Sequence, residues 1–284
     1  MLGLTVPSPG CLFVVATPLG HLQDITLRAL SVLREVSLIA CEDTRHTRTL
    51  LGAHGIGTPT TSYFEHNERW KGERILEALR SGKDVALVSD AGTPGISDPG
   101  FRLVREARAE SIPVLPIPGP SAAVTALSVS GLPTARFLFV GFLPSKAAAR
   151  RRSLEELAGV RETLVFYESP VRLREALADM QSAFGDRDAF LCREATKLYE
   201  EYRRGRLSDL RELLAARGQV KGEIALVVAG AADSAPVTAE TPEALFARLT
   251  QEGRTRRGAV KEIARLTGLP AREVYRRLLA EGRH

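Results

Sequence analysis

The sequence has little cysteine and no long apolar run, and each shortage excludes a class of protein. Its 284 residues include three cysteines, an odd number, spaced far apart at Cys11, Cys41 and Cys192. This spacing suits neither a disulfide framework nor a metal site, so we expect buried thiols in a reducing compartment, the cytoplasm, and no metal. No stretch approaches the roughly 20 apolar residues of a membrane span, and the first residues lack a secretion signal.

Basic charge is concentrated at one end of the chain. The net charge is +5; residues 241–284 hold ten Lys or Arg against five Glu, whereas the preceding 240 residues hold 29 of each sign. A basic appendage on a neutral body is typical of a protein with a polyanionic partner such as nucleic acid. A basic surface that is merely solvated is the alternative.

The most informative stretch is a loop rich in glycine and proline at residues 89–100. The short apolar run 85–88 before it predicts a buried strand, and Asp98 with Pro99 predicts the cap and first turn of a following helix. Glycine lets backbone N–H groups approach a ligand closely, and Asp90 at the strand end can attract a cation. The loop has neither the Gly-Lys-Ser/Thr of a phosphate-binding loop nor the Gly-x-Gly-x-x-Gly of a dinucleotide site.

The first half of the chain repeats the order strand, loop, helix. Strands are expected at 11–16, 36–40, 85–88 and 113–117, and helices after a cap at Asp24, after the polar cluster 41–48, over 72–81 and after Pro-Gly-Pro-Ser at 118–121. This order predicts a mostly parallel α/β sheet, which binds ligands at the carboxyl ends of its strands.

A second α/β domain is expected beyond a boundary at 131–134. Its strands are expected at 137–142, 163–168, 189–193 and 223–229, with a helix beginning at Ser169 and Pro170 and an amphipathic helix over 207–214. The sequence thus predicts an N-terminal α/β domain over 1–131, a C-terminal α/β domain over 132–232, a linker over 231–240 and a basic tail over 241–284.

The tail reads as three short helices. Thr241 and Pro242 begin the first, residues 259–266 form the second, and the third runs from Arg272 to Leu279 after a turn at 267–270. Two helices joined by a glycine-containing turn resemble a DNA-binding helix-turn-helix, and a plain helical hairpin that packs on a partner fits equally well.

Six stretches occur together in one order. They lie at 16–26, 40–45, 65–68, 89–100, 118–122 and 166–170. In this order they resemble the tetrapyrrole-methylase-like group of S-adenosylmethionine-dependent methyltransferases, and within it the bacterial 16S ribosomal RNA cytidine 2′-O-methyltransferases. The resemblance covers about residues 11–232.

This resemblance implies two α/β domains, with S-adenosylmethionine in the cleft between them, in a homodimer whose partner is 16S ribosomal RNA in the small (30S) ribosomal subunit. It also implies a set of cofactor-binding positions, although Ala-Gly-Thr-Pro stands where relatives have Gly-Asp-Pro. The positions are Pro18, Gly20, Asp90, Ala91, Gly92, Ser121, Ala122, Glu168 and Ala195.

Methyl transfer to a ribose hydroxyl needs a nucleophile in line with the leaving sulfur and a base for its proton. Asp43, His66 and Glu68 are the candidate bases, and Arg45 can hold an RNA phosphate. We expect Asp43, Arg45 and His66 to be catalytic because they cluster at expected strand ends. Plainer roles stay open, since Asp43 and Arg45 can form an ion pair at a helix start and His66 can be a surface histidine.

Two other functions remain open. A C-methyltransferase of a porphyrin-like macrocycle shares the architecture, although such a site would want more apolar walls. A non-catalytic RNA-binding protein on a methylase scaffold is the second. The basic tail and the Glu-His-Asn-Glu cluster at 65–68 favour an RNA methyltransferase.

Overall fold

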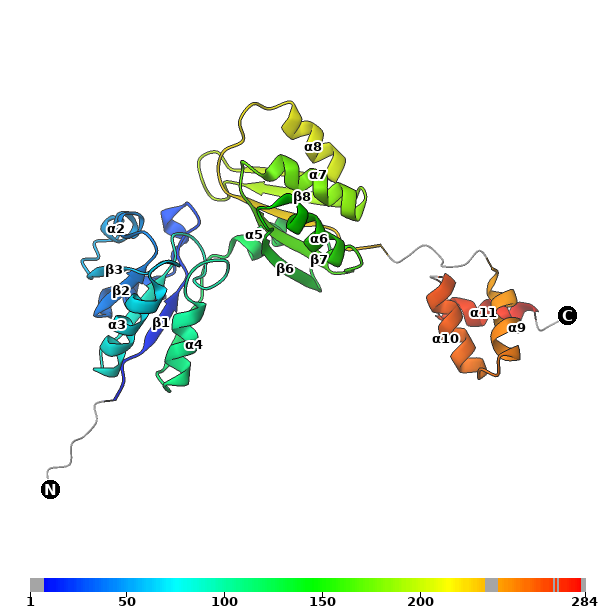
Figure 1. Cartoon of the computed structure of the whole chain (residues 1–284), viewed down its shortest axis with the longest axis horizontal. Coiled ribbons are helices and arrows are strands. Elements are labelled where there is room, and N and C mark those ends of the chain that lie inside the picture. Colours follow the sequence, from blue (N-terminus) through cyan, green and yellow to red (C-terminus); the bar gives the residue numbers. More distant parts are fainter. Residues whose placement is uncertain (1–7, 233–239, 268, 270, 282–284) are drawn as a thin grey trace, which may run out of the picture. The chain divides into compact units, whose positions relative to one another are not determined.

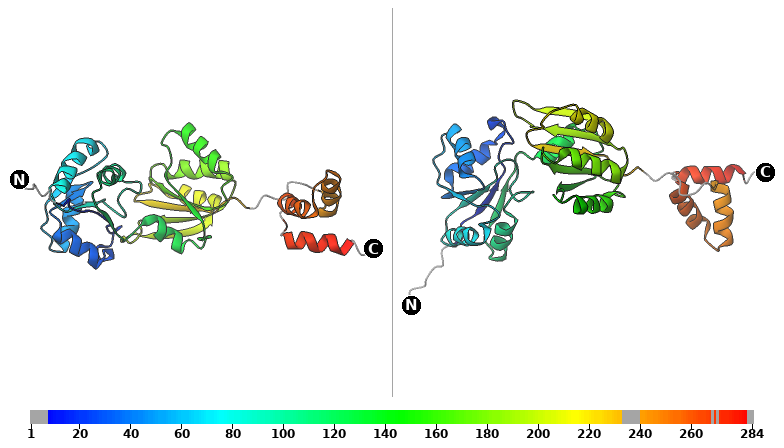
Figure 2. Two further views of the ribbon diagram at one scale, coloured as in Figure 1. Left: turned by 90° about the horizontal axis from the view of Figure 1, so that it is seen from below. Right: turned by 45° about the horizontal axis from the view of Figure 1, so that its top comes forward.

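The computed structural model describes residues 8–232, 240–267, 269 and 271–281 (Figures 1 and 2). Contacts divide the chain into two compact units. The larger holds the described residues up to Leu157 and those from Thr163 to Ala229; the smaller holds Ala158–Glu162 and the described residues from Gly230 onward. In the described part of the chain, every helix is too short or too polar to cross a membrane.

The first sheet of the larger unit is five-stranded and parallel throughout, as the sequence predicts. Its strand order is β3-β2-β4-β1-β5. Along the chain, a helix follows each of the first four strands, and these helices lie beside the sheet (Figure 1). The strands are β1 (Leu12–Val15), β2 (Leu38–Cys41), β3 (Thr60–Ser62), β4 (Val85–Val88) and β5 (Val114–Ile117). The helices are the short 3₁₀ turn η1 (Leu22–Asp24), α1 (Leu27–Glu35), α2 (Thr44–Ala53), α3 (Glu68–Arg80) and α4 (Phe101–Ala109).

Helices cover both faces of this sheet. Because side chains alternate along a strand, Ala86 and Val88 of β4 pack with α1 and α2, whereas Val85 and Leu87 pack with α3 and α4. All four residues of β4 are buried, which confirms the buried strand predicted before the glycine-rich loop. The parallel order brings the loops after β1, β2, β3, β4 and β5 to one edge, where open α/β sheets bind ligands.

The second sheet is also five-stranded, in the order β6-β7-β10-β8-β9. Strand β6 runs parallel to β7, and the other pairs are antiparallel. The strands are β6 (Phe137–Phe142), β7 (Thr163–Glu168), β8 (Asp188–Arg193), β9 (Glu201–Arg206) and β10 (Ile224–Val228). The helices are α5 (Ala122–Val129), α6 (Ala147–Leu157), α7 (Leu173–Phe184) and α8 (Leu207–Ala215).

Helix α5 packs on the second sheet, although it precedes the domain boundary expected at 131–134. Its Ala126 and Leu127 share a core cluster with Val165 of β7 and Val227 of β10. Helix α7 lies against the other face. There, the ring of Phe184 of α7 packs against the ring of Phe166 of β7, with 6.5 Å between the ring centroids. The division into an N-terminal and a C-terminal α/β domain stays a prediction.

The smaller unit holds the three tail helices that the sequence predicts. They are α9 (Pro242–Gln251), α10 (Arg256–Thr267) and α11 (Ala271–Glu281) (Figure 2). Thr241 caps α9 as expected, since its hydroxyl accepts a hydrogen bond from the Ala244 amide. Leu245, Ile263 and Val274 form part of a common core. Most of the expected linker, two residues of the expected turn (Gly268 and Pro270) and the first residues fall outside the described residues.

Three helix starts differ from the sequence prediction. Asp24 ends η1, and Thr26 caps α1 instead. Asp98 does not cap α4, because the chain folds back through a hydrogen bond from the Gly95 amide to the Pro99 carbonyl, and the helix begins at Phe101.

Ser169 and Pro170 likewise do not begin α7, which starts at Leu173. They form a turn around Glu168, whose carboxylate accepts a hydrogen bond from the Ser169 amide at 2.7 Å. Strand β9 was missed because its sequence, Glu-Tyr-Arg-Arg-Gly-Arg, lacks the apolar alternation of a half-buried strand.

A buried ion pair joins α6 to α7. The Nε of Arg150, a residue only 2% exposed, donates to Asp179 at 2.7 Å, and Arg151 donates to the same carboxylate at 2.9 Å. Burial alone would raise the pKa of Asp179, but these hydrogen bonds outweigh it and lower the pKa below its ordinary value. Asp179 therefore stabilises the fold above its unfolded-state pKa, and this contribution is lost as the pH falls.

Asp179→Asn should lower the free energy of unfolding at pH 7 by up to about 3–5 kcal/mol, because it leaves the buried Arg150 with only the exposed Glu175 as counter-charge. The deficit, measured by urea denaturation, should shrink toward pH 3, because below the ordinary pKa of an aspartate the unfolded wild-type chain takes up a proton that the folded carboxylate does not. Arg152→Met is the matched control, since the ion pair of Arg152 on the same helix is exposed. An equal deficit at pH 7 and pH 3 would contradict this account.

Candidate active site

Two loops at the carboxyl edge of the first sheet are tied together by backbone hydrogen bonds. The Thr17 amide donates to the Gly92 carbonyl at 2.9 Å, and the Gly92 amide donates to the Thr17 carbonyl at 3.0 Å. The buried Thr17 hydroxyl also donates to the Ser89 carbonyl. Gly92 has φ +84°, a conformation that glycine adopts without strain. The loop after β1 and the loop after β4 therefore form one surface.

This surface borders a cavity of about 420 Å³ within the larger unit, and residues of both sheets line the cavity. Seven of the nine expected cofactor-binding residues lie in its wall, namely Asp90, Ala91, Gly92, Ser121, Ala122, Glu168 and Ala195. Pro18 and Gly20 do not, although Leu19 between them does. A Cβ on Gly20 would stand 2.2 Å from Lys197 Cγ, so this glycine is needed for packing against the loop after β8.

Carboxylates dominate the polar part of the cavity wall. Glu42, Asp90, Asp98, Glu168 and Glu223 all line it. Burial raises the pKa of Asp98 to about 6. The neighbouring negative charges of Glu42, Asp90 and Glu223 raise this pKa further, whereas a hydrogen bond with the Ser89 side chain lowers it. Burial likewise raises the pKa of Glu42. Such a wall favours a cationic ligand.

Glu168 carries an unused acceptor. This residue is 2% exposed; its Oε1 accepts hydrogen bonds from the Ser169 amide and the Arg172 guanidinium, both at 2.7 Å. Its Oε2 is buried and has no hydrogen-bond partner among the described residues. A buried oxygen without a partner costs free energy, so we infer that a ligand in the cavity donates to it.

Apart from Glu168 and Glu223, the wall formed by the second sheet is aromatic and neutral. Tyr167 accepts a hydrogen bond from the Ala123 amide at 3.0 Å and contacts Phe139 and Phe142 edge to face. Burial raises the pKa of the Cys192 thiol to about 11, so the thiol remains protonated at neutral pH. This side of the cavity suits the flat apolar portion of a ligand.

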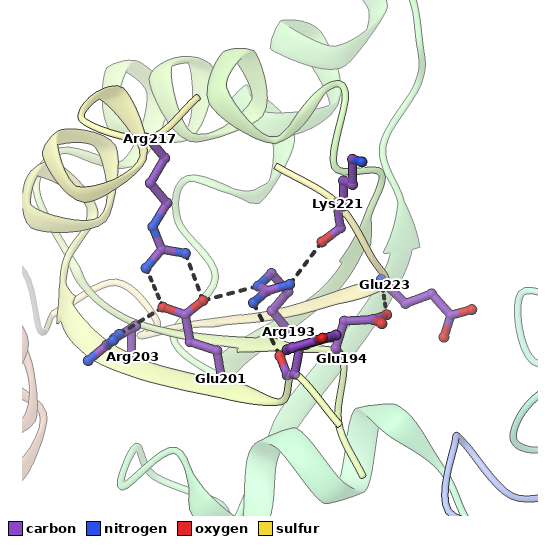
Figure 3. A network of polar contacts seen from close by, with 8 residues as sticks. Arg193, Glu194, Glu201, Arg203, Arg217, Lys221 and Glu223 are labelled. Carbon is purple, nitrogen blue, oxygen red and sulfur yellow. Dashed lines mark hydrogen bonds and ion pairs between the residues drawn. The ribbon is translucent and has the colours of Figure 1, made fainter. Parts of the chain in front are cut away.

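A polar network supports the part of the wall after β8 (Figure 3). Glu201 accepts hydrogen bonds from Arg193, Arg203 and Arg217, which hold its pKa well below the ordinary value. Glu194 accepts from the Glu223 amide at 2.8 Å and thereby fixes the residue next to Gly222.

Close packing and strain accompany this network. A Cβ on Gly222 would stand 2.3 Å from the Cγ of Glu194, so only glycine fits there. Glu194 and Thr196, on either side of Ala195, have φ of +52° and +64°. Strained backbone of this kind is concentrated at binding and catalytic sites.

A second cavity of about 550 Å³ adjoins the first. Glu42 and Asp98 line both cavities, and His66 lines the second, together with Phe64 and Phe101. Sequence reasoning assigned Asp98 to a helix cap and gave no role to Glu42, even though it stands directly after β2 and next to Asp43. Its position at a strand end was the signal that could have identified it.

The remaining expected catalytic residues, Asp43 and Arg45, line neither cavity. They form the ion pair that the sequence left as an alternative, at 2.6 Å, and the Arg45 side chain is 88% exposed. Asp43 also caps α2 through the Arg45 amide. The hydrogen bonds from Arg45 lower the pKa of Asp43, which makes its carboxylate a weak base at neutral pH.

Comparison with known proteins identifies the family of the chain. The family model of tetrapyrrole (corrin/porphyrin) methylases matches residues 11–211. Among curated relatives, proteins named ribosomal RNA small subunit methyltransferase I are 47% identical over 274 residues in Mesorhizobium japonicum (96% of this chain, 92% of the relative) and 45% identical over 271 residues in Halalkalibacterium halodurans (94% and 93%). The protein of that name in Pseudomonas aeruginosa is 53% identical over 225 residues (78% and 80%).

Solved structures share the fold at low sequence identity. A cobalt precorrin-4 methyltransferase has a TM-score of 0.58 at 17% identity (78% of this chain, 94% of that one). A uroporphyrin-III C-methyltransferase from Thermus thermophilus, solved with S-adenyl homocysteine, has a TM-score of 0.56 at 19% identity (78% and 97%). The resemblance drawn from the sequence motifs is thus confirmed: the chain belongs to the tetrapyrrole methylase family, in the group of the ribosomal RNA small subunit methyltransferases I.

Proposed function

We propose that this protein transfers the methyl group of S-adenosylmethionine to the 2′-hydroxyl of a cytidine in 16S ribosomal RNA. The cavity lined by Glu42, Asp90, Asp98 and Glu168 carries the proposal, because a partly buried acidic wall suits a sulfonium cation. The names of the curated relatives, shared over nearly the whole chain, support ribosomal RNA as the acceptor. With such a substrate, we also propose that the protein acts in the cytoplasm.

The cavity residues fit the proposed donor. The unpartnered Oε2 of Glu168 can accept a hydrogen bond from an amino or hydroxyl group of the donor. Leu19, Ala122 and Ile224 supply apolar wall for a purine ring, and the backbone at Gly92 permits close approach. When bound, the donor supplies an electrophilic methyl group on a positively charged sulfur.

Asp43, Arg45 and His66 remain proposed substrate-facing residues. His66 lines the second cavity, as Asp98 does. The exposed Arg45 suits an RNA phosphate, with Asp43 orienting its guanidinium through two hydrogen bonds. This division assigns RNA binding to Asp43 and Arg45 and leaves proton transfer to a group inside a cavity.

A homodimer is also proposed. Helix α5 is apolar on both sides: Ala126 and Leu127 face the second sheet, whereas Val124 and Val129 are more than half exposed. The edge strand β6 exposes further apolar residues, among them Phe137. Exposed apolar surface of this kind is typical of subunit interfaces.

Light scattering should give a mass twice the chain mass of 30.8 kDa, and Val124→Glu should lower the measured mass to the monomer value.

The proposed reaction can be tested directly. Incubation with methyl-labelled S-adenosylmethionine and either 30S particles or free 16S RNA should place the label in an alkali-resistant dinucleotide that contains cytidine, because a 2′-O-methyl group blocks alkaline cleavage. Label on a tetrapyrrole supplied in a parallel incubation, with none on RNA, would favour the macrocycle alternative. Donor binding absent in calorimetry would favour a non-catalytic RNA-binding protein.

The tail helices are proposed to supply phosphate contacts. Neutralising Arg254, Arg257 and Lys261 to Gln, all exposed, should weaken RNA binding and reduce the slope of log K against log salt by about 0.7 per lost contact. Removal of residues 241–284 should reduce the slope at least as much. An unchanged slope in both variants, measured by fluorescence anisotropy, would instead assign the tail a packing role.

A further inference from the structure

The second cavity has aromatic walls that open to solvent. Phe64 and His66 meet edge to face, with 6.5 Å between their ring centroids. Phe101 is 69% exposed, and the guanidinium of Arg105 lies 5.8 Å from its ring centroid. Exposed aromatic rings beside a cation are the usual platform for an unstacked nucleobase.

The charge of this cavity selects which part of a nucleotide can enter. Glu42, Glu65, Glu68 and Asp98 line it. Arg102 also lines it, but its guanidinium is paired at 2.8 Å with Glu106, which lies outside the lining. An acidic cavity repels phosphate, and its carboxylates accept hydrogen bonds from sugar hydroxyls and from the exocyclic amine of cytosine. The cavity therefore suits a nucleoside whose phosphates stay outside.

Asp98 stands where the two cavities meet and is held there by a constrained backbone. The preceding Ser97 has φ +63°, and Gly100 has φ +139°. The Gly100 amide donates to Glu68 at 3.2 Å, which ties the loop to the start of α3. A carboxylate that is common to both cavities and fixed in this way is prepositioned between two ligands.

We propose that the second cavity binds the target cytidine, turned out of the RNA with its base against Phe64 and Phe101, and that Asp98 accepts the proton of its 2′-hydroxyl. This inference rests on the proposed function. In the transfer, the hydroxyl oxygen forms a bond to the methyl carbon and the carbon–sulfur bond breaks. The electron pair of that bond stays on sulfur, and the hydroxyl proton moves to the Asp98 carboxylate.

The surroundings of Asp98 suit it to this role. Its pKa, raised by burial to about 6, gives a stronger base than an ordinary carboxylate and still leaves it ionised at neutral pH. The other titratable or charged groups facing it or lining the same cavities are Glu42, Glu65, His66, Glu68, Asp90, Arg102, Tyr167, Glu168, Cys192 and Glu223. Because the unprotonated form is the base, turnover should rise with pH up to the pKa and level off above it.

The base-binding half of the proposal is tested without turnover. Phe101→Ala should weaken binding of a labelled single-stranded oligoribonucleotide by about 5- to 150-fold, the loss expected for one stacked base. Calorimetric binding of S-adenosylmethionine should stay within twofold of wild type. Tyr199→Ala is the matched control, since Tyr199 is 72% exposed and lines neither cavity. Equal RNA affinity in the Phe101→Ala and Tyr199→Ala proteins would overturn the assignment of the base.

The proton-transfer half is tested by a pH profile. Asp98→Asn should lower kcat by about 10²- to 10⁴-fold, with the KM for 30S particles little changed, and should abolish the rise of kcat with pH. Because Asp98 also lines the first cavity, its substitution can weaken donor binding as well. The affinity of the variant for S-adenosylmethionine is therefore measured separately by calorimetry, so that weaker donor binding is not mistaken for slower proton transfer. Retention of the pH rise in Asp98→Asn, together with its loss in Glu42→Gln, would transfer the role to Glu42 and overturn the proposal.

Different results would contradict the proposed function and the assignment of the second cavity. If wild-type protein transfers no methyl group to 30S particles or 16S RNA, the proposed function fails, whatever the variants do. If it transfers methyl normally while Phe101→Ala binds the oligoribonucleotide as tightly as wild type and Asp98→Asn turns over normally, only the assignment of the second cavity fails.

Discussion

The arrangement on which the rest of this structure depends is a cavity whose carboxylates are not fully neutralised. No ion pair joins Glu42, Asp90 or Asp98 to a lysine or arginine in the described part of the chain. Burying like charges together is costly, and the raised pKa values of Glu42 and Asp98 reflect that cost. A sulfonium ligand would relieve this repulsion. Binding of the proposed donor and stability of the folded protein are therefore linked through the same carboxylates.

The fold assembles this wall from distant parts of the chain. The parallel first sheet brings the loops after β2 and β4 to one edge, and the Thr17–Gly92 pairing fixes the loop after β1 beside them. Glu168 and Glu223 come from the second sheet, where the Glu201 arginine network and the Glu194–Glu223 contact hold the loops around β10. Rigid strands and short constrained loops thus bring together, in one cavity wall, charges that lie up to 181 positions apart in the sequence, from Glu42 to Glu223.

Much of this was predictable from the sequence, for definite physical reasons. The apolar run of β4 and the order of strands and helices predict the parallel sheet, and motif order identifies the family. The role of Asp98 was not predictable, because Asp followed by Pro is a common helix start and only the fold-back of the loop moves α4 to Phe101. Glu223 could not be recognised either, since its place in the wall depends on a contact with Glu194, 29 positions earlier.

Binding of the methyl donor to the acidic cavity through Glu168 is measured by calorimetry of S-adenosylmethionine with wild type and Glu168→Gln. We predict that wild type binds one donor per chain and that the variant binds about 10-fold or more weakly, because a charge-assisted hydrogen bond contributes about 1.5–3 kcal/mol. Equal affinity in the two proteins, with both folded, would contradict it.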